Sequence, residues 1–350
     1  MLKSGRLLLL LTAIFVVTGS ILAYLKIIEM NKEYSIVRLA ECSPSVYKLP
    51  HYIAREFFYR EQNIKIEAVD CGSEKDALDR LERGEADVAL VSPSALVIKR
   101  SSDLKEGGPV IVASFDSGAV FHLVAKKNTT LEDIGQLKNK VIISGPPDSN
   151  ETVYLESILR GAGLKPYDEV SIITNIPDEI KTGALKSGTG DYIFITEKEL
   201  PEALNKGLSR VKSFKAGFPA VVCVASEDFV NNSPGALQSL VNSLYMAQTW
   251  LMYHTPGETN KVIAKSPAIE KSIGMLVEGY YVGGSPAESP VLREESLALV
   301  IGMLDRSREI PMPVSAGGLY DNRFAGAAVQ SIKYVPNDKK ETGIRRLKFW

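Results

Sequence analysis

The sequence predicts an α/β protein with two lobes, preceded by an N-terminal hydrophobic helix. Three observations carry this prediction. Strand-like and helix-like segments alternate between residues 35 and 125, a second block of the same kind follows to about residue 218, and an uncharged apolar run occupies residues 7–25. Alternating strands and helices form parallel sheets with helices on both faces. We therefore expect two such sheets, one in each lobe.

Residues 1–30 are expected to be a transmembrane anchor or a signal segment. The uncharged run has 19 residues, and a helix of that length spans about 28 Å, close to the roughly 30 Å core of a bilayer. Lys3 and Arg6 precede the run and favour a cytoplasmic N-terminus. The run is longer than the usual apolar core of a cleaved signal peptide. We favour a retained membrane anchor, with cleavage and release as the alternative, and both place the rest of the chain outside the cytoplasm.

The first lobe is expected to be discontinuous, built from residues 35–125 plus 219–336. Apolar residues at helical spacing, such as Ala77, Leu78 and Leu81, support its helices. The strand at 121–125 should begin the crossing to the second lobe. Strands are expected at 35–40, 63–69, 86–91, 110–114, 121–125 and 220–225. Helices are expected at 49–62, at 73–83, after the start at 92–94, and at 233–254, 259–265, 269–278 and 294–308.

The second lobe is expected to span residues 126–218 and to repeat the alternation. Residues 337–350 lie beyond both lobes, are rich in charge and are expected to be a loose tail. Strands are expected at 140–144, 170–174 and 191–195, and helices at 131–137, 150–161, 177–186 and 197–205.

Composition argues against several classes of function. The 41 basic and 42 acidic residues give a net charge of −1, which leaves no basic field to hold nucleic acid. The three His residues are far apart in the sequence, and the three Cys residues form no C-x-x-C motif. We therefore expect no metal site and no cofactor. No Walker-type phosphate loop occurs, so ATP hydrolysis by this chain is not expected.

Loops at the carboxyl ends of the predicted strands are the candidates for ligand binding, because ligands of open parallel sheets bind there. The loops at 42–47, 71–73, 92–94, 115–118 and 145–150 place Ser, Gly or Asp near helix starts or strand ends. Free N–H groups at a helix start attract anionic or acceptor atoms. The same residue types are ordinary helix caps, so the hypothesis depends on several loops converging. Tyr47 and Phe115 would then supply flat apolar walls.

Several stretches between residues 35 and 265 carry a family resemblance. The most typical is Leu81-Glu-Arg-Gly-Glu-Ala-Asp-Val-Ala-Leu90, and others are 37–42, 50–54, 57–58, 72–73, 137–141, 145–149, 155–164 and 225–234. With these residues the chain resembles the type 2 periplasmic binding proteins of the sulfonate, nitrate and thiamine-precursor group. The resemblance implies a monomer with the two-lobe type 2 fold, which captures a small molecule and delivers it to the membrane permease and ATPase of an ABC importer.

The candidate loops limit the charge of the expected ligand, and the resemblance implies where the ligand binds. Few Lys or Arg residues accompany the candidate loops, and a multiply charged anion would favour Arg clamps. We therefore expect a neutral or singly charged organic molecule, such as a sulfonate, a pyrimidine or thiamine precursor, or a related aromatic. With Phe115 as an apolar wall, the expected ligand-binding residues are Ser43, Ser45, Tyr47, Ser73, Ser92, Ser94, Phe115, Ser117, Asp148, Ser149 and Asn150.

Cys42 and Cys71 each follow a predicted strand of the first lobe. If those strands are parallel neighbours, the two Cα atoms would lie about 5–6 Å apart, within the range of a disulfide. An exported location permits the bond, and two free thiols at the rim of the cleft are the alternative. Cys223 lies in an apolar strand and is expected to be core.

Two other functions remain as alternatives to solute binding. One is an enzyme on the same fold, of the pyrimidine or menaquinone-precursor type. Its candidate residues are Asp148 with Glu151, or His122, and each is read more simply as a cap or a strand residue. The other is a ligand-sensing module. We do not expect an enzyme, because export argues against a biosynthetic role.

Overall fold

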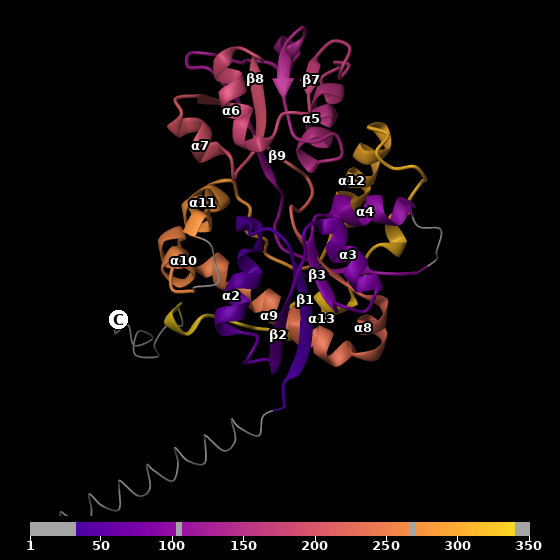
Figure 1. Cartoon of the computed structure of the whole chain (residues 1–350). Coiled ribbons are helices and arrows are strands. Elements are labelled where there is room, and N and C mark those ends of the chain that lie inside the picture. The colour runs from indigo at the N-terminus through magenta and orange to yellow at the C-terminus, as the bar shows by residue number, and fades with distance from the viewer. Residues whose placement is uncertain (1–32, 103–106, 267–270, 340–350) are drawn as a thin grey trace, which may run out of the picture.

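The computed structural model describes residues 33–102, 107–266 and 271–339. Its helices and strands form two α/β lobes, one above the other in Figure 1, and each lobe is built on a five-stranded sheet. The predicted anchor or signal at residues 1–30 lies outside the described residues, as does the end of the predicted tail. Within the described part of the chain, no helix combines the length and the apolar character needed to span a bilayer.

The first sheet has the strand order β2-β1-β3-β10-β4. Strand β1 pairs in parallel with β2 and with β3, whereas β10 is antiparallel to β3 and β4. The short apolar strand β3 is buried along its whole length, as expected for a strand with helices on both sides. The strands are β1 Ser35–Glu41, β2 Ile64–Asp70, β3 Val88–Val91, β4 Val110–Ser114 and β10 Val222–Ala225.

Helices cover both faces of the first sheet. Apolar side chains of α2, α9 and α13 join one core cluster, and those of α3, α4 and α12 join another. Helices α8 and α13 were not predicted. The elements are η1 Val46–Lys48, α2 Leu49–Phe57, α3 Glu74–Glu82, α4 Pro93–Ser102, α8 Glu227–Asn232, α9 Pro234–Tyr253, α10 Pro256–Ile263, α11 Lys271–Val282, α12 Glu294–Arg306, η3 Ala316–Gly318, α13 Arg323–Ser331 and η4 Asn337–Lys339.

The second sheet has the order β7-β6-β8-β5-β9. Strands β6, β7 and β8 run parallel, while β5 is antiparallel to β8 and to β9. Helix α5 packs with the larger apolar cluster, and α7 with a smaller one on the opposite face. The elements are β5 Val120–Ala125, η2 Ile134–Leu137, β6 Val141–Ile143, α5 Asn150–Gly161, β7 Ser171–Ile173, α6 Asp178–Ser187, β8 Tyr192–Thr196, α7 Leu200–Asn205 and β9 Ser209–Lys215.

Strands β5 and β9 differ from the sequence-based expectation. The sequence places the strand at 121–125 at the end of the first-lobe segment, whereas in the structure β5 pairs with β8 and β9 in the second sheet. No strand was predicted at 209–215. In the structure this segment is β9, whose residues are half-buried or exposed. The pairing partner of a strand depends on residues far away in the sequence, which local patterns do not reveal.

The chain passes between the lobes twice, between β4 and β5 and again between β9 and β10. These two crossing segments run side by side and are joined by backbone hydrogen bonds. The N–H of Ala216 donates to the carbonyl of Ala119 at 2.8 Å, and the N–H of Phe115 donates to that of Val221 at 3.1 Å. The approach is closest at Gly118, where a Cβ would lie 2.2 Å from the carbonyl oxygen of Ala216.

Cys42 and Cys71 form a disulfide in the structure, with their Cα atoms 4.9 Å apart. The strands before them are parallel neighbours, with Glu41 opposite Asp70. The residues that follow, Cys42 and Cys71, therefore lie opposite one another. Cys223 is buried in β10. At the other end, Asp338 of the predicted tail forms a hydrogen bond with the His254 ring and Lys339 forms an ion pair with Glu258, and these contacts hold the first part of that segment against α9 and α10.

Candidate functional site

A cavity of about 280 Å³ lies between the lobes, beside the crossing segments. Ligand pockets commonly occupy about 300–1,000 Å³, so this cavity suits a small molecule. Its walls come from the loop that leads into η1, from α11, from the crossing segments, from the start of α5 and from the residues at and after the end of β8. The lining residues are Pro44, Ser45, Val46, Tyr47, Ala119, Val120, Phe121, Ser149, Asn150, Glu151, Thr196, Lys198, Ala220, Ile273 and Leu276.

Tyr47 joins the two lobes at this cavity. Ser45 caps η1 by accepting a hydrogen bond from the Tyr47 N–H, which fixes the start of the short helix. The Tyr47 hydroxyl accepts a hydrogen bond from the Val120 N–H at 2.8 Å, and its ring packs edge-on against Tyr280. Burial raises the pKa of Tyr47 well above its usual value, so the hydroxyl stays protonated and retains a proton to donate.

Helix α5 presents its N-terminus to the cavity. Ser149 is the N-cap and accepts a hydrogen bond from the Thr152 N–H at 3.2 Å. Asn150 is the first helical residue, and its side-chain oxygen is shielded from solvent without a hydrogen-bond partner among the described residues. A buried polar atom of this kind calls for a partner. The free N–H groups of the helix start add positive potential at the same place.

Behind the N-terminus of α5, the ammonium group of one lysine forms ion pairs with three carboxylates. Lys181 of α6 is 1% exposed, and its Nζ lies 3.0 Å from Glu151, 2.7 Å from Asp178 and 3.2 Å from Glu199. Burial and the charge of Glu199 raise the pKa of Glu151, while Lys181 opposes the shift. The single ammonium cannot neutralise three carboxylates, so the most buried of them, Glu151, is the one inclined to hold a proton.

The residues at and after the end of β8 complete the second-lobe wall. The Thr196 hydroxyl and N–H both donate to Glu199, at 2.8 and 2.9 Å, which holds this turn in place. Lys198 lines the cavity and is exposed. In the described part of the chain its ammonium has no recorded carboxylate or hydrogen-bond partner. Its positive charge at the edge of the cavity is therefore available to a ligand.

Helix α11 closes the cavity from the side of the first lobe. Ile273 and Leu276 contribute apolar surface to it. Further along the helix, a Cβ at Gly279 would lie within 2 Å of a carboxylate oxygen of Glu197. Glu197 follows β8, and its carboxylate forms a hydrogen bond with the ring of His122 in β5. A side chain at position 279 would displace the Glu197 carboxylate, so glycine permits this close approach, which brings the apolar face of α11 to the cleft.

Four of the expected ligand-binding residues lie together in this cavity: Ser45, Tyr47, Ser149 and Asn150. The other seven do not line it, and most have a structural contact instead. Ser73 caps α3, and Ser92 hydrogen-bonds the carboxylate of Glu74. Phe115 is fully buried in the first core. The rest are the exposed Ser43 and Asp148, the buried Ser94, and Ser117, whose hydroxyl donates to the carbonyl of Gly284 at 2.6 Å.

Sequence reasoning missed Thr196, Lys198 and the α11 residues of the cavity. The first two follow a predicted strand, so the same rule of carboxyl ends that selected the other loops would have found them. Ile273 and Leu276 carry no such signal, because an apolar residue on an amphipathic helix usually packs in the core. Their position in the cleft depends on where α11 docks.

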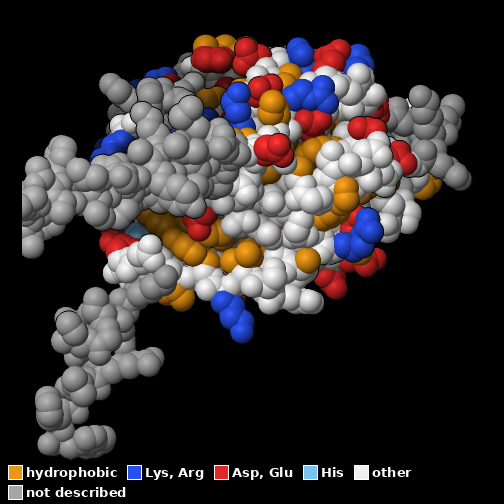
Figure 2. Space-filling model, turned by 90° about the horizontal axis from the view of Figure 1, so that it is seen from below, with side chains coloured by type: hydrophobic (Ala, Val, Ile, Leu, Met, Phe, Trp, Pro, Cys, Tyr) orange, Lys and Arg blue, Asp and Glu red, His pale blue; other side chains and the backbone are white. Residues whose placement is uncertain are grey.

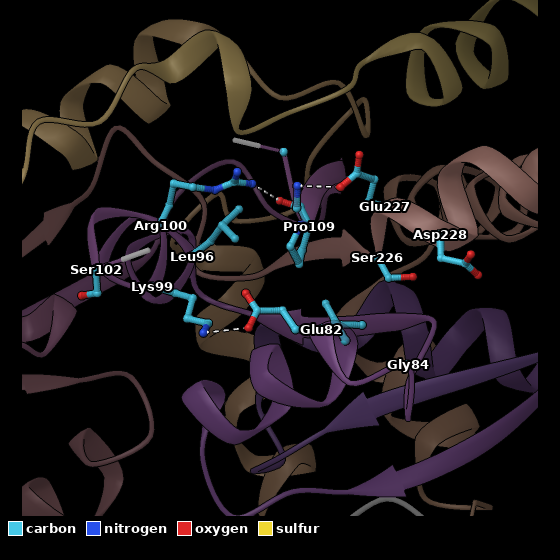
Figure 3. Close-up of a pocket in the computed structure, with 13 residues that line it drawn as sticks. Glu82, Gly84, Leu96, Lys99, Arg100, Ser102, Pro109, Ser226, Glu227 and Asp228 are labelled. Carbon is cyan, nitrogen blue, oxygen red and sulfur yellow. Dashed lines mark hydrogen bonds and ion pairs between the residues drawn. The ribbon is translucent and has the colours of Figure 1, made fainter. Parts of the chain in front are cut away.

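A second hollow, on the outer side of the first lobe, has a different character. Its lining mixes acidic and basic side chains that already have partners (Figure 3). Lys99 pairs with Glu82, the Arg100 guanidinium donates to the carbonyl of Pro109, and Glu227 accepts from the Gly108 N–H. Lys99 and Glu82 neutralise one another, and Arg100 and Glu227 are held by backbone groups, so the charged side chains of this hollow are already engaged. Across the described residues, no group of His, Cys, Asp and Glu side chains is arranged to hold a metal ion.

Comparison with known proteins gives the family and the fold of this chain. The family model described as NMT1/THI5 like matches residues 46–258. The chain belongs to the NMT1/THI5-like family. The Bacillus subtilis protein YtlA, named as a binding protein, is 24% identical over 326 residues, which cover 89% of this chain and 96% of YtlA.

Among solved structures, this NMT1/THI5-like chain resembles the periplasmic aliphatic sulphonate binding protein of Escherichia coli. The TM-score is 0.67 at 15% identity, and the match covers 83% of this chain and 99% of the other. The periplasmic nitrate-binding protein of Synechocystis PCC 6803 has a TM-score of 0.64 at 16% identity, with coverage of 87% and 91%. At these identities the likeness shows the fold, which is the two-lobe type 2 periplasmic-binding-protein fold.

Proposed function

We propose that this member of the NMT1/THI5-like family is the extracytoplasmic solute-binding component of an ABC importer. The observation that carries the proposal is the interlobe cavity, whose two sides have different chemistry. Val46, Ile273 and Leu276 give the first-lobe side an apolar surface, whereas Asn150, Thr196 and Lys198 give the second-lobe side a polar one. A molecule that satisfies both sides contacts both lobes and favours their closure.

The relatives support the proposal in kind. YtlA is named as a binding protein, and the two structural neighbours are named for periplasmic sulphonate and nitrate binding. A solute-binding component would deliver its ligand to a membrane permease that is driven by an ATPase. We propose that the chain acts as a monomer on the outer face of the bacterial cell membrane, held there by the uncharged run at residues 7–25.

The cavity also narrows the ligand that we propose. Lys198 and the N-terminus of α5 together suit one acidic group, such as a sulfonate or carboxylate. Asn150 supplies an unpaired oxygen that would accept a hydrogen bond from a donor on the same molecule. The rings of Tyr47 and Phe121 suit a flat or apolar body. A small aromatic sulfonate or carboxylate satisfies all three requirements, and a neutral pyrimidine satisfies the last two.

A thermal-shift screen of the purified full-length protein tests this proposal. Aromatic sulfonates, aromatic carboxylates, alkyl sulfonates and pyrimidines would be compared at equal concentration, followed by calorimetry on any compound that raises the melting temperature. We expect an acidic compound to bind the wild type and to bind Lys198→Gln about tenfold or more weakly, the loss typical of a charge-assisted hydrogen bond.

Lys127→Gln is the matched control. Lys127 is exposed at the end of β5, away from the cavity, and its substitution removes the same charge. Binding unaffected by Lys198→Gln would assign the ligand to the neutral class. Chemical conversion of the bound compound, followed by mass spectrometry, would replace solute binding with an enzyme on this fold.

We propose that the lobes divide where the sheets do. The first lobe then ends near Ser117 and resumes near Ala220, and the second lies between them. This division moves β5 into the second lobe, in agreement with its pairing to β8 and β9. The crossing segments would act as the hinge. Spin labels on the exposed residues Lys75 and Lys165, one in each lobe, should approach one another when the ligand binds.

A further inference from the structure

A third cavity, distinct from the interlobe cavity and from the hollow shown in Figure 3, lies at the end of the first lobe that faces away from the second lobe. It has a volume of about 440 Å³ and is formed mainly by α2 and the edge strand β2. The chain enters the first lobe beside it, since Tyr34 lines the cavity and Ser35 begins β1. Its lining residues are Tyr34, Arg55, Tyr59, Arg60, Ile64, Lys65, Ile66 and Ala68.

The charged side chains that line this cavity of α2 and β2 are all basic. Arg55, Arg60 and Lys65 line it, and no Asp or Glu is among its lining residues. Among the described residues, Lys65 pairs with the exposed Glu67, whose carboxylate lies 3.5 Å from the Lys65 ammonium. The hollow on the outer side of the first lobe is lined by charges of both signs, so the one-sided charge of the cavity formed by α2 and β2 is not a general property of hollows on this protein.

Arg55 is the central observation. Its Nε and one of its terminal nitrogens are shielded from solvent and have no hydrogen-bond partner in the described part of the chain. Its guanidinium carbon lies 5.5 Å from the centre of the Tyr52 ring, a contact that orients the group but satisfies none of its N–H donors. A buried charged donor without an acceptor is costly. When the Arg55 side chain turns toward the cavity that it lines, an anion there would supply the missing acceptor.

The shape of the cavity indicates the kind of anion. Ile64, Ile66 and Ala68 of β2 give it an apolar side, while the three cations give it a basic one. Guanidinium groups bind phosphate oxygens with paired, directional hydrogen bonds. A bare inorganic ion would use only the basic side. A phosphate that is attached to glycerol and acyl groups would use both.

The position of the cavity indicates where such a molecule would come from. The uncharged run in the sequence ends at Leu25, nine residues before Tyr34, and nine extended residues reach at most about 30 Å. The described chain starts at the pole of the first lobe that is farthest from the second lobe (Figure 1). Seen from that side, much of the visible surface is uncharged or hydrophobic, and its Lys and Arg side chains form a few separate groups with Asp and Glu side chains among them (Figure 2).

We propose that the cavity formed by α2 and β2 binds the phosphate of an anionic phospholipid headgroup, with Arg55 and Lys65 as its ligands. The lipid contact orients the first lobe on the membrane surface and leaves the cleft directed away from it. Free phosphate offers the same oxygen atoms, so the experiment must separate the two sources.

The test uses the full-length protein in a non-ionic detergent and native mass spectrometry. Phosphatidylglycerol and phosphatidylcholine are added separately, and bound lipid is counted. We expect the wild type to retain phosphatidylglycerol in preference to phosphatidylcholine. Arg55→Gln and Lys65→Gln should each weaken this retention about tenfold, while Lys127→Gln should retain it as the wild type does. All four proteins carry the same N-terminal segment, so lipid bound there cancels in the comparison.

The other outcomes overturn the proposal. Equal retention of phosphatidylglycerol by the wild type, Lys65→Gln and Arg55→Gln would show that the cavity does not bind lipid. Calorimetric binding of inorganic phosphate or glycerol phosphate, as tight as that of the lipid and lost in the same variants, would assign the cavity to a soluble phosphate. Lys65 is exposed, so Lys65→Gln keeps the test decisive even if Arg55→Gln does not fold.

Discussion

The carboxylate of Asp116 accepts a hydrogen bond from the backbone N–H of Ala220 at 2.9 Å. The two residues belong to different crossing segments between the lobes. The same carboxylate accepts from the N–H of Val221 at 3.1 Å and from that of Gly118 at 3.0 Å. One buried side chain therefore joins the two crossing segments of the proposed hinge, next to the first sheet.

The Asp116 hydrogen bonds predict a pH dependence of stability. Burial is the largest influence on Asp116 and raises its pKa to about 7, although the backbone donors oppose the shift. The unfolded chain has an Asp pKa of about 3.9, so the folded state binds the proton more tightly. The stability that this proton provides is present below about pH 4 and is lost as the pH rises through about 7.

Urea unfolding of the wild type and Asp116→Asn at several pH values measures this effect. Asn does not titrate, so the difference in unfolding free energy between the two proteins should change by up to about 4 kcal/mol between about pH 4 and pH 8. The wild type should lose stability relative to Asp116→Asn as the pH rises. Parallel pH profiles for the two proteins would show that Asp116 does not titrate in this range.

Gly118→Ala should destabilise the protein strongly. The φ of Gly118 is +148°, and an added Cβ would lie 2.2 Å from the carbonyl oxygen of Ala216 on the other crossing segment. We expect a loss of about 3 kcal/mol or more, since neither backbone can move without breaking the Asp116 hydrogen bonds. Gly235→Ala in α9 is the control, because open space surrounds that position. A melting temperature of Gly118→Ala equal to that of the control would contradict the close approach.

Loss of the disulfide should destabilise the first lobe. Cys42 and Cys71 close a loop with a sequence separation of 29 residues, and such a loop contributes about 3–4 kcal/mol in the chain-entropy account. The double variant Cys42→Ser, Cys71→Ser should therefore melt at a lower temperature than the oxidised protein. Alkylation and mass spectrometry without reductant should modify neither residue, and two alkylated thiols at these positions would exclude the bond.

Tyr47→Phe should weaken both stability and ligand binding. The substitution removes the acceptor of the Val120 N–H and leaves that buried donor unpaired, which costs about 1–3 kcal/mol. Calorimetry with a ligand identified for the wild type measures the effect on affinity, and urea unfolding measures the effect on the free protein. Tyr167→Phe, at a half-exposed hydroxyl bonded to Glu156 outside the cavity, is the control. Unchanged values for Tyr47→Phe would remove Tyr47 from the interlobe contact.

The sequence by itself determined the alternation of strands and helices and the two-lobe fold. Local patterns carry that information, because apolar spacing and capping residues are properties of neighbouring positions. Ser149 before α5 and Ser73 before α3 are examples, and both are caps in the structure. The same locality limited the site prediction. A serine that caps a helix and a serine that binds a ligand look alike in a sequence.

Only the tertiary structure decided which of these residues meet. Strand β5 entered the second sheet because its partners are β8 and β9, and no local pattern encodes that pairing. Lys198, Ile273 and Asn150 come from three distant parts of the chain and reach one cavity only through the docking of α11 and the turn after β8. Contacts between segments so far apart depend on how whole elements pack, which is why the sequence indicated a cleft but left most of its walls to the fold.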